Sequence, residues 1–364
     1  MKEQRVGPPR RTSQRERKSG WMKVGIIGTG AVAGKHALAY RNIGYELTAC
    51  TDRTVDKGEK FATNWGADFV TTPEELARRD DVDHLDVCTF PAYRLEAVEL
   101  GAKYRKHVLV QKPMAVELAT AAQMIAIARG AGIQLGVVSQ HRFDDSILFL
   151  KRAIADGRLG RILEADAYVK WYRSTEYYAR PVKGSWAGEG GGALISQAIH
   201  QVDMLLYLVG AVDEVFGYWQ LGALHKVESE DLVNAVMRYK NGATGVLQAA
   251  TALWPGYPER IEIHGTKGSA IVTGDQLTTW DVKDDEGEPA PIAHDAKSGA
   301  SDPMAISLTP FERTFLDFGE ACKTGRAPNS SGVVGYRALE LVTAIYESCR
   351  SGRTVKLSAE LPVG

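Results

Sequence analysis

The sequence predicts an α/β protein with two folded domains. The first is built on a parallel sheet, and the second is an α+β domain with an open, largely antiparallel mixed sheet. The chain has 364 residues, too many for one typical domain and suitable for two. Up to residue 142, short apolar runs alternate with helical segments, which is typical of a parallel sheet with crossover helices. From residue 143 the apolar runs lengthen, and turn signals such as Asn241-Gly242 indicate antiparallel hairpins.

The elements expected in the first domain, residues 22–142, follow from apolar periodicity and from cap residues. Strands are predicted at residues 24–27, 46–51, 69–70, 85–89, 107–110 and 135–138. Helices are predicted up to about residue 43, at 55–65, from Pro73 onward, at 93–104 and at 117–129. Gly44 can end the first helix because glycine readily adopts a positive φ.

The second domain, residues 143–364, is expected to begin with a helix at 145–156. Strands are predicted at residues 162–171, 214–219, 232–239, 245–252, 261–264 and 269–272. Residues 283–302 are polar and are interpreted as a surface loop, and helices at about 309–323 and 332–350 close the chain. Residues 1–21 precede both domains. They are rich in arginine and lysine and almost free of apolar residues, so we expect a disordered basic tail.

Charge and cysteine usage narrow the functional class. A formal net charge of −1 gives no reason to expect a nucleic acid or a membrane surface as partner. We identify no apolar run of membrane-spanning length and expect no transmembrane helix. The four cysteines lie far apart, which favours buried thiols in a reducing, cytoplasmic compartment. No metal site is predicted, because His200 and Asp203 alone are too few ligands.

A glycine turn joins the first strand to the first helix. Gly28 allows the tight turn, and Gly30 has no Cβ, so a pyrophosphate can approach the backbone. The N–H groups at the helix start, at Ala31 and Val32, would face the phosphates. This is the strand–turn–helix order of a Rossmann dinucleotide-binding fold.

The next strand ends on Asp52, which is placed to bond the adenosine ribose hydroxyls. Its carboxylate would repel a 2′-phosphate and therefore favours NAD. Arg53 leaves NADP open, because a guanidinium can stack on adenine or bind that phosphate.

Two later segments carry candidate chemistry. Thr89 ends one predicted strand and Pro91 follows it, and Gln111 and Lys112 follow another, so all four should lie at the carboxyl edge of the parallel sheet, where ligands of open α/β folds bind. We expect all four at the cofactor site, although Lys112 also fits an ordinary solvated strand end.

A triple glycine opens a helix that places Ser196, His200 and Asp203 on one polar stripe. His200 is either a half-buried structural histidine or an acid/base group, for which its ordinary pKa near neutrality is suited.

Several segments together resemble the glucose–fructose oxidoreductase, inositol dehydrogenase and MocA (Gfo/Idh/MocA) superfamily, from Met22 to near the C-terminus. VGIIGTGAVAGKHA resembles its opening, HVLVQKPMA its HVLxEKPxA segment and GGGALISQAIHQVDML its GGGxLxDxGxHxxDxL segment. IEIHGTKGSA and LELVTAIYESCRSGRTVKL resemble its closing elements. The resemblance implies that Lys112 and His200 flank the substrate carbon and the nicotinamide C4. It also implies a cis Lys112–Pro113 peptide and a second domain whose sheet mediates a homodimer or homotetramer.

Three positions depart from the family pattern. Gln111 stands where glutamate is usual, Ser196 where an aspartate often precedes the histidine, and Arg94 near a common histidine. Without a carboxylate at position 196, His200 lacks a partner that would raise its pKa and orient its ring. Ser196 and Gln197 can still bond a substrate hydroxyl.

The predicted activity is NAD(P)-dependent hydride transfer between the nicotinamide and a ring secondary alcohol or ketone of a sugar, glycoside or cyclitol. His200 would accept the hydroxyl proton while Lys112 polarises that oxygen. Arg173 and Tyr178 are candidates for substrate contacts or for an interface, and Arg142 either contacts substrate or braces the domain junction. Two alternatives stay open: a glycoside-cleaving or isomerising enzyme with transient hydride transfer, and a non-catalytic dinucleotide sensor.

Overall fold

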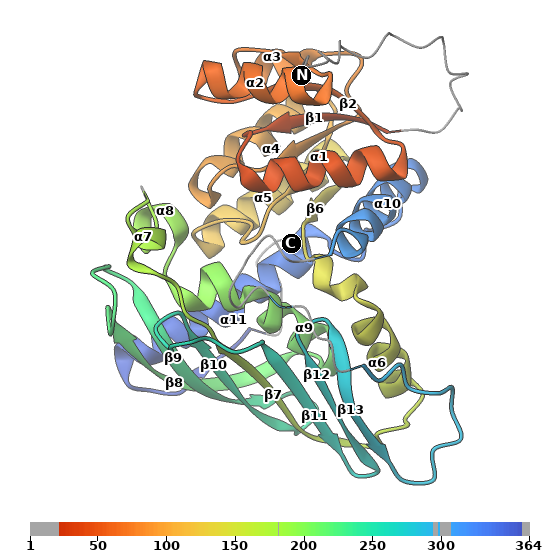
Figure 1. The fold of residues 1–364 in the computed structure, drawn as a ribbon, viewed down its shortest axis with the longest axis vertical. Coiled ribbons are helices and arrows are strands. Elements are labelled where there is room, and N and C mark those ends of the chain that lie inside the picture. The colour runs from red at the N-terminus through yellow and green to blue at the C-terminus, as the bar shows by residue number, and fades with distance from the viewer. Residues whose placement is uncertain (1–21, 181, 294–297, 299–306, 359–364) are drawn as a thin grey trace, which may run out of the picture.

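The structure, a computed structural model, describes residues 22–180, 182–293, 298 and 307–358. The expected tail at residues 1–21 and part of the expected loop at 283–302 lie outside these ranges. Figure 1 shows two sheets, one near each end of the molecule, with helices between and around them.

Six parallel strands form the first sheet, in the order β3-β2-β1-β4-β5-β6. The strands are β1 (Lys23–Ile27), β2 (Glu46–Thr51), β3 (Asp68–Phe69), β4 (His84–Val87), β5 (His107–Val110) and β6 (Leu135–Val137). The helices are α1 (Ala31–Ile43), α2 (Val55–Trp65), α3 (Pro73–Arg78), α4 (Arg94–Lys103) and α5 (Leu118–Ala131). The predicted parallel sheet is therefore confirmed, with shifts of a few residues at element ends.

Local sequence signals explain how several of these helices start and stop. Gly44 ends α1 with φ +80°. Thr72 accepts a hydrogen bond from the backbone of Glu75, and the Glu75 carboxylate accepts one from Thr72, which closes a capping box at the start of α3.

The second sheet has eight strands in the order β13-β12-β11-β7-β10-β9-β8-β14. Among the described strands of this second sheet, only β7 and β10 pair in parallel. The strands are β7 (Ile162–Lys170), β8 (Val212–Leu221), β9 (Glu230–Tyr239), β10 (Thr244–Ala250), β11 (Arg260–Gly265), β12 (Gly268–Thr273), β13 (Gln276–Val282) and β14 (Val355–Lys356). The sequence did not predict β13 or β14. The mixed, mostly antiparallel sheet is confirmed.

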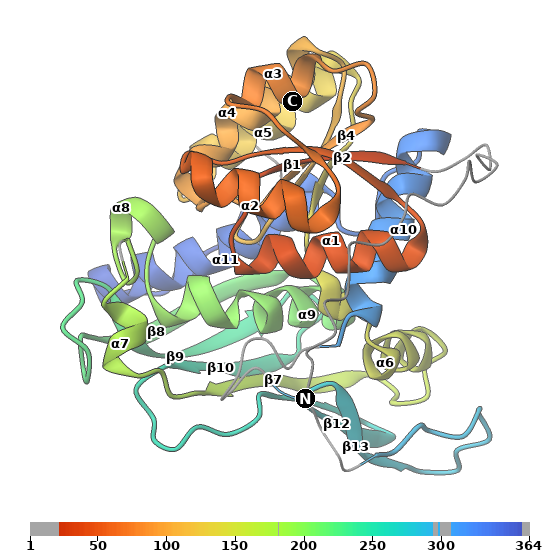
Figure 2. The ribbon, with the colours of Figure 1, turned by 45° about the horizontal axis from the view of Figure 1, so that its top comes forward.

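Helices and short helical turns complete this half. They are α6 (Asp145–Ala155), α7 (Thr175–Tyr178), α8 (Trp186–Glu189), α9 (Ile199–Val209), α10 (Thr309–Thr324) and α11 (Gly332–Ser351). Two short 3₁₀ helices follow strands of the first sheet. The helix Pro91–Tyr93 lies between β4 and α4, and the helix Gln140–Phe143 lies between β6 and α6. Figure 2 shows α9 and α11 between the two sheets, and α11 packs against α5 on one side and β8 on the other.

The C-terminal part of the chain returns to the first sheet. Helix α10 packs on α1, and its Phe311, Phe315 and Phe318 share one apolar core with residues of β1 and α1. The ring of Phe315 stacks on that of Tyr40 with centroids 4.2 Å apart.

One stretch, residues Trp186–Val209, is long and apolar enough to cross a membrane by length and composition alone. This stretch was not anticipated from the sequence, which predicted no apolar run of membrane-spanning length. In the structure 67% of its most apolar window is buried inside the fold. Such burial is also typical of a core helix, and α9 packs here against β7 and α11.

Candidate functional site

The glycine turn after β1 has the geometry that its sequence predicts. Gly28 adopts φ +90°, and a Cβ there would lie 3.0 Å from the Thr89 side chain. A Cβ on Gly30 would meet nothing within 4 Å, so the space beside its backbone is open. The first helical hydrogen bond runs from Gly34 to Gly30, which leaves the N–H groups of Ala31 and Val32 at the helix start without helical partners.

Asp52 lies beside this turn. Its Oδ2 accepts hydrogen bonds from the backbone and hydroxyl of Thr29, both at 2.8 Å, and from Lys57 at 3.2 Å. Its Oδ1 accepts one from the backbone of Thr54 at 3.0 Å. Burial works to raise the pKa of Asp52, but these hydrogen bonds outweigh it and lower the pKa. The neighbouring Arg53 guanidinium lies 4.9 Å from the centre of the Tyr93 ring.

The strand ends of β4 and β5 form the next part of the site. The hydroxyl oxygen of Thr89 is buried and has no hydrogen-bond partner among the described residues. Pro91 is buried at the start of a 3₁₀ turn. Arg94 donates to the carbonyls of Thr89, Gln111 and Pro113, and burial lowers its pKa to about 9.

Lys112 lies at the carboxyl edge of the first sheet, as predicted. The Lys112–Pro113 peptide is cis, which agrees with the expectation from the resemblance. The ammonium donates to the backbone carbonyl of Ser196, with an Nζ–O distance of 2.9 Å. Burial, reinforced by the positive charge of Lys183, lowers the pKa of Lys112 to about 7.

Gln111 is buried beneath the Lys112 backbone. Its amide nitrogen lies 2.8 Å from Nε2 of His36, and the Nδ1 of that histidine lies 2.7 Å from the Asp86 carboxylate. His36, Asp86 and Cys88 place ligand-type atoms within 4.8 Å of one another. Hydrogen bonds among these three residues and Gln111 account for the cluster, so we assign no metal to it.

The triple glycine leads into the helix that carries His200. Gly191 has φ +146°, and a Cβ on Gly192 would lie 1.8 Å from the Glu230 carbonyl oxygen. The Glu230 carboxylate accepts hydrogen bonds from the backbones of Gly192 and Leu194 at 2.8 and 2.9 Å. Burial raises the pKa of Glu230 to about 7.

Residues Leu194–Ala198 form a π-helical turn before α9. Such turns often occur at functional sites. This one contains both Ser196 and Gln197, and it directs the Ser196 carbonyl toward Lys112.

His200 lies one turn further and is partly buried. Its ring packs edge-on against that of His141, with centroids 4.8 Å apart, and its Nε2 lies 3.4 Å from the amide nitrogen of Gln140. Burial and the nearby charge of Lys112 keep the pKa of His200 well below its usual value. The neighbouring His141 binds Asp144 at 2.7 Å; burial opposes protonation there, yet the carboxylate raises the pKa of His141.

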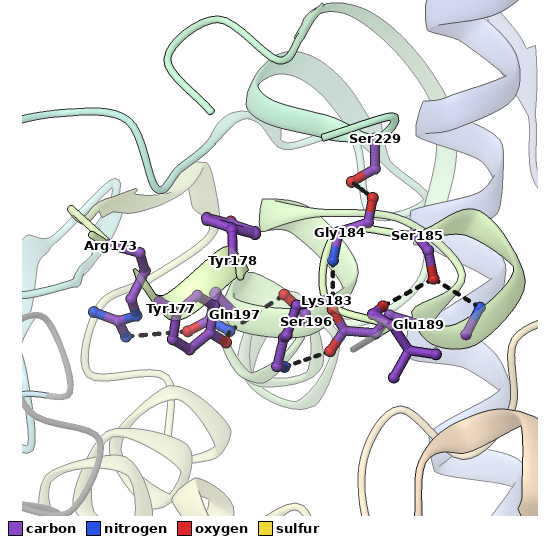
Figure 3. A network of polar contacts seen from close by, with 12 residues as sticks. Arg173, Tyr177, Tyr178, Lys183, Gly184, Ser185, Glu189, Ser196, Gln197 and Ser229 are labelled. Carbon is purple, nitrogen blue, oxygen red and sulfur yellow. Dashed lines mark hydrogen bonds and ion pairs between the residues drawn. The ribbon is translucent and has the colours of Figure 1, made fainter. Parts of the chain in front are cut away.

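Figure 3 shows the polar network on the other side of Ser196. Arg173 donates to the side-chain oxygen of Gln197 at 3.0 Å. The amide nitrogen of Gln197 donates to the hydroxyls of Tyr177 and Ser196 at 3.0 and 3.2 Å. Ser196, Gln197 and Arg173 therefore meet in one place, and the substrate contacts expected of each of them stay predictions.

The polar atoms of two other candidates, Tyr178 and Arg142, contact protein groups outside this network. The Tyr178 hydroxyl pairs with that of Thr251 at 2.6 Å, and burial raises the pKa of Tyr178 strongly. Arg142 binds Asp203 through two hydrogen bonds of 2.8 and 2.6 Å and also donates to the Asn329 carbonyl at 3.1 Å. These contacts tie Arg142 to α9 and to the Asn329 backbone, and both alternatives for Arg142 stay predictions.

Four further residues that lie at this site were not among the predicted site residues: Tyr177, Lys183, Glu189 and Gln140. Lys183 pairs with Glu189, and its ammonium lies 5.1 Å from the centre of the Tyr177 ring. Ser174 caps the single turn of α7, and this cap directs Tyr177 toward Gln197. The cap pattern Ser174-Thr175-Glu176 was visible in the sequence and could have indicated a helical turn at this place.

The residues at the first site fit a dinucleotide. The open space beside Gly30, the N–H groups at the start of α1 that lack helical partners and the buried Thr89 hydroxyl offer what a pyrophosphate and ribose require. Asp52 is held ionised beside the same turn.

Two family sequence profiles match the chain. One is described as an oxidoreductase family with an NAD-binding Rossmann fold and matches residues 22–139. The other is the GFO/IDH/MocA C-terminal domain and matches residues 147–271. Fold, site and profiles together define an NAD-binding oxidoreductase. The chain belongs to the Gfo/Idh/MocA family.

Named relatives agree with this class. Myo-inositol 2-dehydrogenase of Thermotoga maritima is 29% identical over 92% of this chain and 98% of its own length. A 1,5-anhydro-D-fructose reductase of Ensifer adhaerens is 27% identical over 93% and 99%. The crystal structure of the WlbA dehydrogenase from Bordetella pertussis, in complex with NADH and UDP-GlcNAcA, is 28% identical with a TM-score of 0.82, over 93% of this chain and 100% of that one.

Proposed function

We propose that this chain is an NAD-dependent dehydrogenase that transfers hydride between the nicotinamide and a ring secondary alcohol or ketone of a sugar, glycoside or cyclitol. The observation that carries the proposal is the position of Lys112, whose ammonium bonds Ser196 beside His200 at the carboxyl edge of the cofactor-binding sheet. The named relatives act on cyclitols and sugars of this kind, which supports the same substrate class here.

Lys112, His200 and the bound cofactor have separate roles in the proposed hydride transfer. When bound, NAD supplies the hydride acceptor. Lys112, with a pKa of about 7, takes the proton from the substrate hydroxyl during oxidation and returns it during reduction. His200 stays neutral at neutral pH, so it contributes a hydrogen bond that orients the same oxygen. This assignment reverses the roles expected from the sequence, in which His200 accepted the proton and Lys112 polarised the oxygen.

Neighbouring polar side chains supply positioning. Ser196, Gln197 and Tyr177 form a connected set of donors and acceptors, which suits the hydroxyls of a sugar ring. Arg173 holds Gln197 in place. We assign Tyr178 and Arg142 to bracing, because Thr251 and Asp203 already bind their polar atoms.

The cofactor is NAD. Asp52 is ionised, and its Oδ1, which accepts one hydrogen bond from Thr54, can accept a second from a ribose hydroxyl, while its charge opposes a 2′-phosphate. Arg53 lies over Tyr93, where its guanidinium and this ring can contact the adenine.

The proposal includes a cytoplasmic location and a homo-oligomeric assembly. The four cysteines are free thiols, which supports a cytoplasmic enzyme. The second sheet exposes Tyr218 and Val236, at 70% and 54%, and Val236 also lines a hollow of about 330 Å³ along β8, β9 and β10. These features support a homo-oligomer formed through this sheet.

A spectrophotometric screen tests the function. Purified protein is mixed with NAD or NADP and with a panel of cyclitols, aldoses, anhydrosugars and glycosides, and reduced cofactor is followed by its absorbance. We expect NAD to be reduced by at least one ring alcohol, and Lys112→Met to abolish the signal. Binding of NAD with no turnover on any panel member would contradict the proposal and favour a sensor. Product without net cofactor reduction would favour the isomerising alternative.

A further inference from the structure

A buried chain of hydrogen bonds ends on the backbone of Lys112. The Lys112 N–H can only donate, and it points at Oε1 of Gln111, 3.1 Å away. The Gln111 amide nitrogen must then face Nε2 of His36, at 2.8 Å, and donate to it. His36 therefore carries its proton on Nδ1 and donates to Asp86 at 2.7 Å. Only one arrangement of protons satisfies all three contacts.

The chain is isolated from solvent. His36 and Asp86 are 0% exposed and Gln111 is 7% exposed. The ring centroids of Phe311 and Phe315, both on α10, lie 5.6 and 4.9 Å from the centroid of the His36 ring. A buried network whose members are all hydrogen-bonded is rigid, because each broken contact would leave a polar group unpaired in an apolar environment.

Arg94 holds the same stretch of backbone at two further points. Its guanidinium donates to the carbonyls of Gln111 and Pro113, the residues on either side of Lys112. The backbone around Lys112 is thus fixed at the carbonyl before it, at its own N–H and at the carbonyl after it. The side chain starts from this fixed point and reaches Ser196.

We propose that Gln111, supported by His36 and Asp86, is a positioning residue that holds Lys112 in register with Ser196 and His200. The proposal rests on the function proposed above, in which Lys112 exchanges the substrate proton. Gln111 touches neither Ser196 nor His200 in the contacts that fix it, and it acts through the Lys112 backbone.

Gln111 has a second consequence because its amide is neutral. The charged and titratable groups that influence Lys112 come from several elements: Lys183, Glu189, Arg94, Arg173, His141 and His200. Glu189 is the one acidic group among them. A carboxylate at position 111 would place a new negative charge next to the Lys112 backbone and favour the ammonium form.

Four substitutions test the proposal. Gln111→Met removes the hydrogen bonds, and Gln111→Glu keeps an acceptor for Lys112 but adds charge. His36→Gln can keep both contacts through one amide, whereas His36→Leu breaks them. Tyr239→Phe, which loses a buried hydrogen bond to Ala165 in the second sheet, is the matched control for loss of buried polarity.

We expect Gln111→Met to lower kcat by about 10- to 100-fold, since small misplacement of a reacting group has effects of this size. Its NADH affinity and melting temperature should stay close to those of Tyr239→Phe. His36→Gln should recover most of the activity that His36→Leu loses. Gln111→Glu should move the pH midpoint of kcat/KM upward by about one unit.

The ammonium titration gives a readout that needs no substrate. With lysine labelled at Cε, NMR follows Lys112 directly, and the resonance is identified by its loss in Lys112→Arg. An upward shift of this titration in Gln111→Glu supports the proposal even if no sugar reacts, in which case only the proposed function fails. Unchanged kcat in Gln111→Met, or equal losses in His36→Gln and His36→Leu that follow melting temperature alone, would overturn the positioning role.

Discussion

The ammonium of Lys112 and the backbone carbonyl of Ser196 are 2.9 Å apart, although 84 residues separate them in the chain. This contact joins the end of β5 in the first sheet to the π-helical turn before α9 in the second domain. It brings the candidate proton-exchanging group to the place where Gln197 and Tyr177 present polar atoms.

Replacing Lys112 tests its proposed chemistry. We expect Lys112→Met to bind NADH as the wild type does and to lose about 10²- to 10⁴-fold in kcat, the usual contribution of one acid/base group. Lys112→Arg should be almost as inactive, because arginine stays protonated and cannot accept the substrate proton. Single-turnover rates with the best substrate measure both, and an active arginine variant would argue for a purely electrostatic role.

The pH dependence of oxidation should follow Lys112. Its pKa of about 7 means that the lysine is protonated at lower pH and cannot act as a base there. We therefore expect kcat/KM for alcohol oxidation to rise with pH through about 7 and then level off, while kcat/KM for ketone reduction falls over the same range. A profile flat between pH 6 and 8 in both directions would show that another group exchanges the proton.

Adjacent tyrosines should behave differently. Tyr177→Phe removes a hydroxyl that accepts from Gln197, and we expect it to raise KM by about tenfold, the effect of losing one hydrogen bond of about 1.4 kcal/mol. Tyr178→Phe breaks the bond to Thr251 and should lower the melting temperature with little change in KM. Steady-state kinetics and thermal melts on both variants separate the two outcomes, and the reverse pattern would reassign the residues.

Cofactor preference should depend on Asp52. We expect Asp52→Ser to weaken NAD binding by about tenfold, because a hydrogen bond between an ionised group and a ribose hydroxyl is worth about 1.5–3 kcal/mol. NADP binding should improve, since a negative charge is removed from beside the 2′ position. Titrations of both cofactors check this, with Lys57→Met as control for the loss of the Asp52 partner.

The triple glycine should tolerate no side chain at its third position. Gly192→Ala would place a Cβ 1.8 Å from the Glu230 carbonyl, and we expect it to lower the free energy of unfolding by about 3 kcal/mol or more. Gly130→Ala, on α5 with nothing within 4 Å, should instead be neutral or stabilising by up to about 1 kcal/mol. Urea unfolding measures both, and equal effects would show that the segment can shift.

Local signals predicted much of the first sheet and the cofactor turn. Gly28, Gly30 and Asp52 act through backbone geometry and strand ends, which sequence spacing determines directly. The edge position of Lys112 followed in the same way. By contrast, β13 was missed because polar and threonine residues dilute its apolar alternation.

Long-range contacts account for what the sequence did not reveal. Gln111 and His36 are 75 residues apart, and Gly192 and Glu230 are 38 apart, so no local pattern indicates either pair. Tyr177 and Tyr178 are neighbours in a single helical turn, and only the packed structure shows that they point to different partners. The π-helical turn that aims the Ser196 carbonyl likewise interrupts an otherwise regular helical pattern.

The return of α10 onto α1 has a consequence for synthesis. Phe311, Phe315 and Phe318 complete a core whose other members include Val24 and Tyr40. While the ribosome is still translating the middle of the message, that apolar surface has no cover, although the six strands beneath it have already emerged. The apolar core around Val24 and Tyr40 therefore stays incomplete, with its surface exposed to solvent, until α10 has been synthesised near the end of translation.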